Sequence, residues 1–500
     1  MCVVVTLLAF TDVVIAGRHG AERPNVLLIG IDDLNDWVEP LRGHPNVQTP
    51  NLKRLAARGL TFTNAHCQAP LCNPSRCSLM TSLRPSTTGI YGLAPFFRHT
   101  EEWKDRVSLN QFFRQRGYET FYAGKIYHGH HGRTESEFDH VGPPGTPGIM
   151  PKQKLVPVTP AGNNPWVDWG VFEHDEKEKG DYKVASWCVE QLDRWNGDQP
   201  FFMACGFFNP HVPCYATPAL WDRYDHERIT MPFVDHKDRL DCSPFAWYLH
   251  WRLPEPRMSW LNHHDQHRKL VHAYLSCITF ADAQVGRVLD ALDRSGQADN
   301  TIICLWSDHG YHLGEKNMMG KTTLWERSTH VPLIFAGPQI PAGETTNSPA
   351  ELLDVYPTLV ELCGFDVAAE LEGESLMAQI RQPHTIRERP AITVHNPGNQ
   401  SIRGVRYRLI RYADGSEELY DLQQDPQEQT NLVNVADHQD AAKRLRGYSI
   451  KEMAPLIEGS DARVLERKPD GWYWEHQKID PDQPPLSIEP HKPADLPRVR

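Results

Sequence analysis

The chain has 500 residues and a mass of 57.1 kDa, more than one hydrophobic core usually supports, so we expect a large lobe and a smaller one. Hydrophobic residues make up 40% and charged residues 23%, a composition that excludes an intrinsically disordered chain. The formal net charge of -12 argues against a nucleic-acid or anionic-membrane binder, and 11 cysteines are too few for a disulfide-dense scaffold. Any anionic ligand therefore needs a local cluster of cations.

The N-terminal residues 2–16 are largely apolar and end in Val14-Ile15-Ala16, like an export signal with its cleavage site. No basic segment precedes them, and Asp12 interrupts them. We expect 1–16 to be a signal peptide and the protein to be periplasmic or secreted; the alternative is an apolar first strand in a cytoplasmic protein. The segment is too short to span a bilayer and no later run is longer, so we expect no integral membrane segment.

Four continuous apolar runs, at 25–31, 119–124, 200–208 and 301–306, are typical of strands buried on both faces of a sheet. Ligands of parallel α/β sheets bind beyond the carboxyl ends of the strands, so we expect the polar side chains that follow these runs to meet at one site. These side chains are Asp32, Asp33, Lys125, His128, His211, Asp308 and His309.

Helical patterns lie between these runs. Thr49-Pro50 is a helix start followed by apolar residues on one face, residues 268–293 carry an apolar stripe, and 77–83 is predicted as a further helix. Alternating strands and helices predict an α/β fold, with a doubly wound, mostly parallel sheet flanked by helices across 22–384. The runs 142–165 and 212–265 have no clear period and are predicted as insertions.

The C-terminal part changes to short strands from about residue 385. The segment 407–422 alternates around Asp414-Gly415, a favourable hairpin turn. We predict a smaller α+β lobe with an antiparallel sheet at 385–465. A proline-rich tail at 466–500 is expected to lie on the surface or to be mobile.

The most informative motif is Cys72-Asn73-Pro74-Ser75-Arg76. A thiol next to a helix N-terminus predicts a lowered pKa and a site suited to an anion. The motif is similar to the CxPSR maturation signal of the formylglycine-dependent sulfatases, in the alkaline phosphatase superfamily. The resemblance extends to IDD at 31–33, SLRPSTTGIYG at 82–92, GKxxH at 124–128, PHVP at 210–213, SDHG at 307–310, Lys321 ahead of THVPLI at 329–334, and LYDLxxDPxExxNL at 419–432.

The resemblance implies that a maturation enzyme binds the protein transiently and oxidises Cys72 to formylglycine. One hydroxyl of the hydrated aldehyde would attack sulfur, and the second would expel sulfate by re-forming the carbonyl. A divalent cation is implied at position 72 and at Asp32, Asp33, Asp308 and His309. The carboxylates and the family likeness favour Ca²⁺, whereas the imidazole leaves Mg²⁺, Mn²⁺ or Zn²⁺ open.

The remaining catalytic side chains are also implied by the resemblance. Arg76, Lys125 and Lys321 would bind the sulfate oxygens and the hydrated aldehyde. His211 would protonate the leaving alcohol, and His128 would remove the proton from the second hydroxyl. Lys125, His211 and Lys321 would thus contact the substrate.

Two details resemble the iduronate 2-sulfatase branch: the spacing of Lys125 and His128, and histidine after Asp308. The expected function is exo-acting removal of sulfate from a sulfated sugar, with a uronate 2-sulfate as the first candidate. The alternatives are a phosphonate monoester or phosphodiester hydrolase on the same fold, and a noncatalytic sulfoglycan-binding protein with unmodified Cys72. Six residues near motif edges or in the smaller lobe are candidate sugar contacts, although base rates favour a packing or solvent-exposed role for each: Trp37, Arg84, Trp325, Glu326, His395 and Asn396.

Overall fold

The computed structural model describes residues 23–196, 199–235 and 237–482, so the signal peptide expected at 1–16 lies outside the described residues. Its centre is an eight-stranded sheet in the order β13-β2-β12-β9-β1-β7-β4-β5. The four predicted strands are neighbours in this sheet and all parallel. They are β9 (Thr301–Ser307), β1 (Asn25–Ile31), β7 (Phe201–Phe207) and β4 (Glu119–Gly124).

The edges of the sheet are mixed. Strand β12 (Leu333–Ala336) runs antiparallel to both β9 and β2 (Gly59–Phe62), whereas β13 (Glu344–Thr346) is parallel to β2. Strand β5 (His140–Pro144) closes the other edge, parallel to β4. The expectation of a mostly parallel sheet is confirmed.

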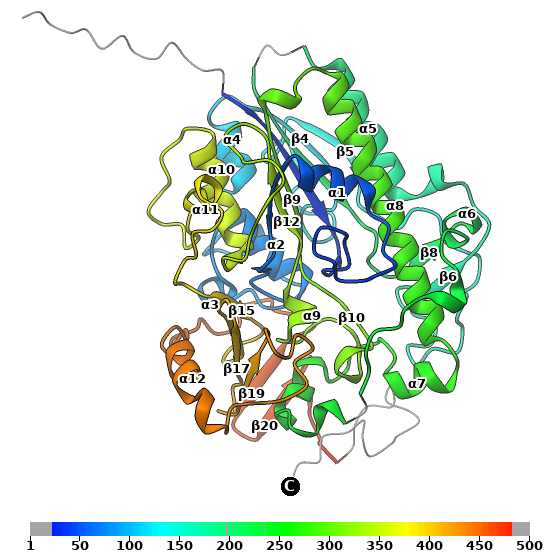
Figure 1. The fold of residues 1–500 in the computed structure, drawn as a ribbon, viewed down its shortest axis with the longest axis vertical. Coiled ribbons are helices and arrows are strands. Elements are labelled where there is room, and N and C mark those ends of the chain that lie inside the picture. The colour runs from blue at the N-terminus through cyan, green and yellow to red at the C-terminus, as the bar shows by residue number, and fades with distance from the viewer. Residues whose placement is uncertain (1–22, 197–198, 236, 483–500) are drawn as a thin grey trace, which may run out of the picture.

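Both faces of the sheet are covered, which explains the continuous apolar runs. Along β1, Leu27 and Ile29 pack into one core and Val26 and Leu28 into the other. Figure 1 shows helices on the two sides of the central strands. The first core includes residues of α1 (Pro50–Ala57), α5 (Gly180–Arg194) and α8 (His267–Arg294); the second includes α2 (Cys72–Thr81), α4 (Leu109–Arg114), α10 (Val355–Leu362) and α11 (Met377–Arg381).

Helix α2 differs from the helix predicted at 77–83. It begins at Cys72, after the extended residue Leu71, and ends before Ser82, which adopts a left-handed conformation (φ 52°). Pro74 lies in the first turn, where a proline is tolerated because the first N–H groups have no partner within the helix. The signature motif is therefore the first turn of the helix.

The C-terminal lobe is built around an antiparallel sheet, as expected. Its strands follow sequence order, and Gly415 (φ 91°) forms part of the predicted hairpin turn. Helix α12 (Gln439–Arg446) packs on this sheet. The strands are β15 (Ala391–Val394), β16 (Gln400–Arg403), β17 (Tyr407–Arg411) and β18 (Glu417–Asp421).

The start of the expected tail is ordered, which corrects the boundary at 466. Strands β19 (Leu465–Lys468), β20 (Gly471–Trp474) and β21 (Gln477–Lys478) form a further antiparallel sheet. The reason is apolar burial: Trp474 is fully buried and packs in one cluster with Leu465 and Tyr420. The proline-rich composition applies to the residues beyond this sheet.

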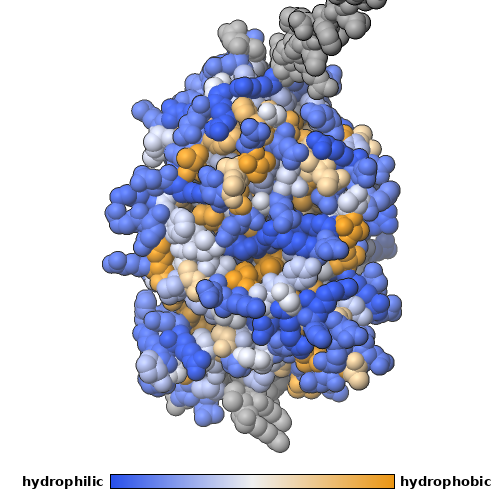
Figure 2. Space-filling view, turned by 90° about the vertical axis from the view of Figure 1, so that its left-hand side faces the viewer, coloured by the Kyte–Doolittle hydropathy of each residue, from blue (hydrophilic) through white to orange (hydrophobic). Residues whose placement is uncertain are grey.

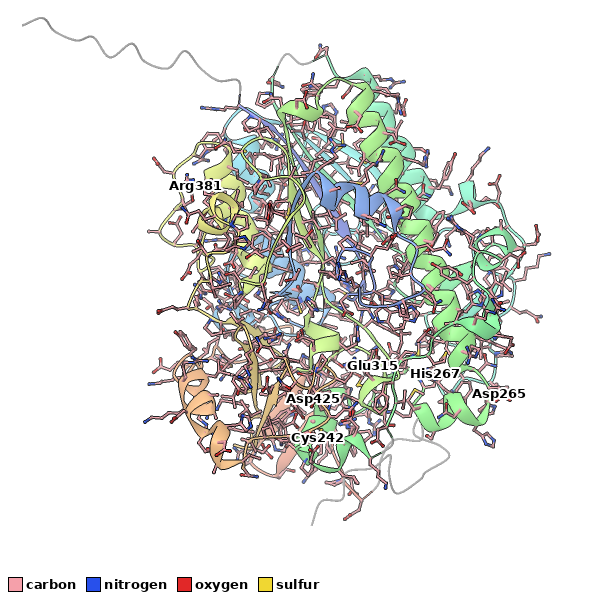
Figure 3. The ribbon with its side chains drawn as sticks, viewed as in Figure 1. Cys242, Asp265, His267, Glu315, Arg381 and Asp425 are labelled. Carbon is pink, nitrogen blue, oxygen red and sulfur yellow. The ribbon has the colours of Figure 1, made fainter. Side chains whose placement is uncertain are left out.

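The insertion 212–265 joins the two lobes. Its 3₁₀ segment Pro244–His250 packs against Tyr412 and Trp474, and Cys242 Sγ lies 3.5 Å from Tyr420 Oη. Figure 3 labels Cys242 of this insertion and Asp425 of the C-terminal lobe in the lower part of the molecule. Short elements complete the chain: β3 (Ala65–His66), α3 (Pro85–Thr88), β6 (Trp169–Val171), β8 (Cys214–Ala216), α6 (Pro218–Trp221), α7 (Met258–His263), β10 (His312–Leu313), β11 (Met319–Gly320), α9 (Glu326–Thr329) and β14 (Ala350–Glu351).

The helices and one face of the surface bear on contact with a membrane or with a large apolar partner. In the part of the chain that the structure describes, no helix is long and apolar enough to cross a bilayer. On the face drawn in Figure 2, hydrophilic residues predominate and hydrophobic residues form small separate groups. This face therefore offers no broad apolar patch for a partner.

Candidate active site

The residues that follow β1 and β9, Asp32-Asp33 and Asp308-His309, lie close together at the carboxyl end of the central strands, as expected. Ile31 and Ser307 are partners in the pairing of β1 with β9, so the residues after them lie side by side. The Asp33 N–H donates to Asp308 Oδ1 at 3.1 Å. Asp33 has a left-handed backbone (φ 58°), a conformation that strand residues do not adopt. The tight turn after β1 thus aims this carboxylate at the end of β9.

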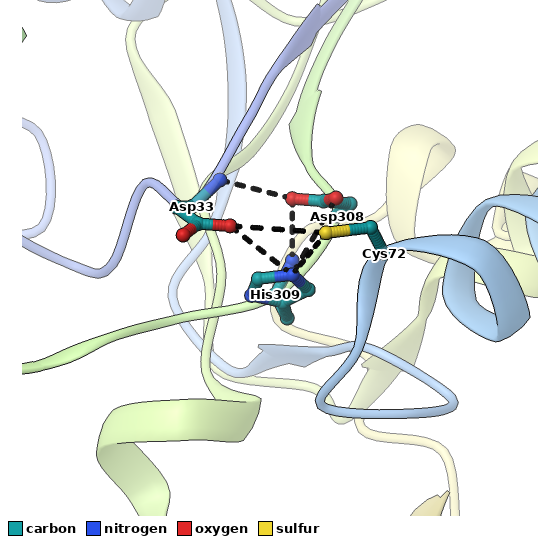
Figure 4. A group of neighbouring side chains, drawn as sticks. All are labelled: Asp33, Cys72, Asp308 and His309. Atoms are coloured by element: carbon teal, nitrogen blue, oxygen red, sulfur yellow. Dashed lines mark hydrogen bonds and ion pairs between the residues drawn. The ribbon is translucent and has the colours of Figure 1, made fainter. Parts of the chain in front are cut away.

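Helix α2 brings Cys72 to these residues. Its Sγ lies 3.3 Å from His309 Nε2 and 4.0 Å from Asp33 Oδ1. Figure 4 shows Cys72 at the start of the helix, facing Asp33, Asp308 and His309 from the ends of β1 and β9. The four side chains are buried, and one ligand atom of each lies within 4.8 Å of the others.

Arg76 lies one helical turn after Cys72 and is completely buried. Its Nε donates to Asp308 Oδ2 and its Nη2 to Asp32 Oδ1, both at 2.8 Å. Its Nη1 donates to the carbonyl groups of Lys125 and Ile126. These donors hold the two acidic strand ends and the loop after β4 together. Contact of Arg76 with sulfate therefore remains a prediction from the family likeness.

Two lysines provide the local cations that the acidic chain requires. Lys321 Nζ lies 3.2 Å from Cys72 Sγ and 2.7 Å from Asp33 Oδ1. Lys125 Nζ lies 3.9 Å from the same sulfur and is bonded to Asp32 Oδ2. Both lysines are at most 7% exposed. An anion at position 72 would thus contact two ammonium groups that are shielded from water.

The electrostatics follow from this arrangement. Burial alone would raise the pKa of Cys72, but Lys125, Lys321 and His309 hold it well below its usual value. Burial raises the pKa of Asp308 to about 7, even though Arg76 is paired with it. For Asp32, burial would raise the pKa, but the charges of Lys125, His211 and Arg76 together lower it. The centre therefore stabilises negative charge at position 72.

The two histidines of the predicted acid/base pair flank this centre. His128 is hydrogen-bonded to Cys72, and burial lowers its pKa. His211 follows β7, and its Nε2 lies 3.9 Å from Asp33 Oδ2. The loop that carries it is fixed by Asp181 of α5, which accepts the N–H groups of Phe208 and Asn209 at 2.6 and 2.8 Å. No sequence motif had pointed to Asp181.

A pocket of about 430 Å³ opens above Cys72. The predicted residues Lys125, His128, His211 and Lys321 line it. His130, which belongs to none of the sequence motifs, lines it too. Further lining residues that the sequence analysis did not identify are Thr146, Asn164, Trp166, Phe208, Glu255 and Arg463.

The six candidate sugar contacts are not among the residues lining this pocket. Trp37 and Trp325 are core residues, and Arg84 forms a buried ion pair with Glu351 at 2.6 Å. Glu326 is paired with Arg408, while His395 and Asn396 bond to main-chain groups. Nearness to a motif in sequence was not a sufficient signal, because these side chains have partners inside the protein.

The acidic cluster fits a divalent cation. Asp33 Oδ2 is buried and has no hydrogen-bond partner within the described chain, a costly state that a cation would relieve. Asp32, Asp33 and His211 form a second compact group beside the one at Cys72. Three carboxylates suit a hard ion, and His309 adds a nitrogen donor.

Comparisons with known proteins agree with this geometry. The family described as Sulfatase matches residues 24–365, and that described as N-sulphoglucosamine sulphohydrolase, C-terminal, matches 314–454. A protein named Sulfatase from Formosa agariphila is 40% identical over 426 residues, covering 83% of each chain. Human iduronate 2-sulfatase is 31% identical over 383 residues, covering 69% of this chain and 64% of its own.

Solved structures share the fold. A structure described as a 2-O GAG sulfatase matches with a TM-score of 0.68 at 23% identity, covering 85% of this chain and 91% of the other. The phosphonate monoester hydrolase of Agrobacterium radiobacter gives a TM-score of 0.66 at 21% identity, covering 90% and 99%. Since these two scores are nearly equal, the fold alone does not distinguish sulfate esters from phosphonates.

Proposed function

The chain belongs to the sulfatase family and is a sulfuric ester hydrolase; on this premise we propose that it removes sulfate from a sulfated sugar with position 72 as the nucleophile. The observation that carries the proposal is the setting of Cys72. Its sulfur lies within 3.9 Å of two buried ammonium groups, at the base of the pocket. A sulfate group entering this pocket would meet the nucleophile and two compensating cations at once.

We propose that Cys72 is converted to formylglycine by a separate maturation enzyme. An aldehyde hydrate would supply a hydroxyl nucleophile and a second hydroxyl through which sulfate is released. Asp32, Asp33, Asp308 and His309 would hold a divalent cation, with Ca²⁺ as the first candidate; when bound, this ion would supply positive charge that stabilises the nucleophile and screens the sulfate. Arg76 would hold the carboxylates of Asp32 and Asp308 in position to bind this cation.

The two histidines divide the proton transfers in this proposal. His211 lies on the pocket side of Asp33, where it can donate a proton to the oxygen of the leaving alcohol. His128 lies beside position 72, and its lowered pKa keeps it neutral at pH 7, so it can accept the proton of the second hydroxyl. Lys125 and Lys321 bind the sulfate oxygens.

The proposed substrate is a uronate 2-sulfate at the end of a glycan chain. Iduronate 2-sulfatase is among the relatives, and the Lys125–His128 spacing is similar to that branch. Because Cys72 lines this pocket and is only 1% exposed, we expect a terminal sugar to reach it more easily than a residue inside a polymer. Arg463 lines the same pocket and could face the sugar carboxylate. We also propose that the protein is exported.

Mass analysis of the tryptic peptide 59–76 tests the nucleophile. Conversion of the Cys72 thiol to an aldehyde lowers the mass by about 18 Da. Cys67 lies in the same peptide and provides an internal control, because it should still react with an alkylating agent. An unchanged mass together with sulfate release by the same preparation would contradict the assignment. An unchanged mass without turnover would favour the noncatalytic binding protein.

The reaction is tested with the matured enzyme. Turnover of defined sulfated disaccharides, measured as inorganic sulfate, should exceed turnover of an aryl phosphonate, and Cys72→Ala should abolish both. Since Cys72 and alanine are both small, we expect this variant to keep its melting temperature. A preference for the phosphonate would instead support the phosphonate hydrolase alternative.

A further inference from the structure

Glu255 is a buried carboxylate in the pocket that the reaction as described above does not use. It lies in the insertion, between the 3₁₀ segment Pro244–His250 and α7, and lines the same pocket as Cys72. Its side chain borders Gly320 of β11: a Cβ atom placed on that glycine would lie 3.4 Å from Glu255 Cγ and 3.6 Å from its Cδ. The next residue, Lys321, contacts Cys72 Sγ. Glu255 is therefore close to the strand that supplies a sulfate-binding lysine.

One oxygen of this carboxylate, Oε2, has no hydrogen-bond partner among the residues that the structure describes. Glu255 is only 4% exposed, yet its Oε2 accepts no hydrogen bond, and it forms no ion pair with the residues that the structure describes. Glu351 is buried to a similar degree, but Arg84 donates to both of its oxygens at 2.6 and 2.7 Å. Burying an unpaired carboxylate is unfavourable, so Glu255 is an exception that calls for a partner from outside the chain.

The surroundings indicate what that partner is. An ionised carboxylate only accepts hydrogen bonds, so the ligand must present a donor. Trp166 and Phe208 line the pocket with apolar faces, against which the C–H groups of a sugar ring can pack. Lys125, Lys321 and Arg463 already make the pocket cationic, which disfavours a ligand whose donor is itself a cation.

We propose that Glu255 is a substrate-binding residue that accepts a hydrogen bond from a hydroxyl of the sugar that carries the sulfate. The inference rests on the proposed function and makes it more specific: the enzyme selects a hydroxylated sugar sulfate over a sulfate ester that has no donor next to the reacting group. A site built to accept a hydroxyl discriminates strongly, because its buried acceptor is left unpaired by any other ligand.

Kinetics of Glu255→Gln in the full-length matured enzyme test this role. The substitution keeps the size of the side chain but halves its acceptor capacity. We expect kcat/KM for a sulfated disaccharide to fall at least about 10-fold more than kcat/KM for 4-nitrophenyl sulfate, which carries no hydroxyl. Glu344→Gln, in the edge strand β13 and exposed, is the matched control and should lower neither. Equal losses on both substrates would overturn the proposal.

A substrate-side substitution identifies the hydroxyl. Removing the hydroxyl next to the sulfate from the disaccharide should lower kcat/KM of the wild-type enzyme. The expected decrease equals the one that Glu255→Gln causes with the complete substrate. The two changes together should cost no more than either alone. Additive losses would show that Glu255 does not contact this group. A wild-type preference for choline sulfate that Glu255→Gln removes would assign the carboxylate to a cationic substrate and would likewise overturn the proposal.

Equilibrium binding separates this proposal from the proposed function. The sulfated disaccharide is titrated into the Cys72→Ser variant and into the double variant Cys72→Ser, Glu255→Gln. These binding measurements do not require turnover. Weaker binding in the double variant, by about 10-fold, would support Glu255 even if the wild-type protein released no sulfate. Equal affinity in both proteins, or binding in neither, would overturn it whatever the fate of the hydrolase assignment.

Discussion

At the scale of single residues, the centre is defined by charges that compensate one another. Cys72 lies between two ammonium groups, and Arg76 is bonded to one carboxylate from each of two strands. None of these groups would be stable alone at this depth, because a buried charge without a partner is strongly unfavourable. The side chains therefore form one unit, and the effect of replacing any of them depends on the others.

His211→Ala tests the proposed acid. Loss of a general acid should reduce kcat/KM by about 10²–10⁴-fold for a sugar sulfate, whose alkoxide is a poor leaving group. The loss should be much smaller for 4-nitrophenyl sulfate, because that phenolate leaves without a proton. The ratio of the two losses is the measurement. A ratio near one would show that His211 serves binding instead of proton transfer.

At the scale of elements, the reacting groups come from the ends of strands, and their loops are anchored by helices behind them. Asp181, in the first turn of α5, bonds two N–H groups of the loop that carries His211. Asp181 is 1% exposed and does not line the pocket, whereas Phe208, one of the two residues that it holds, does. It ties the orientation of His211 to the packing of α5 on the sheet.

Asp181→Asn tests this anchor. Burial raises the pKa of Asp181 from 3.8 to about 6, so the folded state holds this proton more tightly than the unfolded state. The wild-type free energy of unfolding should thus lose up to ~3 kcal/mol as pH rises from about 4 to 6, and this part of the slope should vanish in the variant. Loss of one acceptor should also lower kcat/KM about 10-fold. Denaturant titrations at pH 4, 5, 6 and 7 measure the slope; an unchanged slope would contradict the assignment.

At the scale of the whole molecule, the pocket is shared by parts of the chain far apart in sequence. The loops that follow strands of the central sheet supply Lys125 and His211, the insertion supplies Glu255, and the C-terminal lobe supplies Arg463. The insertion packs into the same apolar cluster as β18 and β20, so the two lobes share a core. We therefore expect substrate specificity to depend on both lobes, whereas the proposed reacting groups lie mainly on the larger one.

Removal of the cation should affect the whole fold. A divalent ion that binds only the folded centre would add stability by mass action, so exhaustive EDTA treatment should lower the melting temperature by ~2–5 °C and abolish turnover. Adding back Ca²⁺, Mg²⁺, Mn²⁺ or Zn²⁺ singly identifies the ion by recovery of both properties. Full activity in a preparation shown to be free of metal by elemental analysis would contradict the proposed site.

Much of the fold and of the centre is determined by the sequence itself. Runs such as 25–31 predict strands buried on both faces, because only such strands carry apolar residues without alternation. The carboxyl ends of parallel strands meet at one edge of a sheet. For this reason the sequence alone predicts that Asp32-Asp33 and Asp308-His309 lie side by side. These features depend on the local residue pattern and on the order of strands and helices, and both can be predicted from the sequence.

Only the tertiary structure decided where the other groups point. Side chains from distant segments determine whether Arg76 faces the pocket or the carboxylates and whether Glu255 has a partner. They also determine which candidate sugar contacts are core residues. The start of α2 at Cys72 and the strands within 465–478 were missed for the same reason. A proline or an aromatic residue permits several local structures, and packing against the rest of the protein selects one of them.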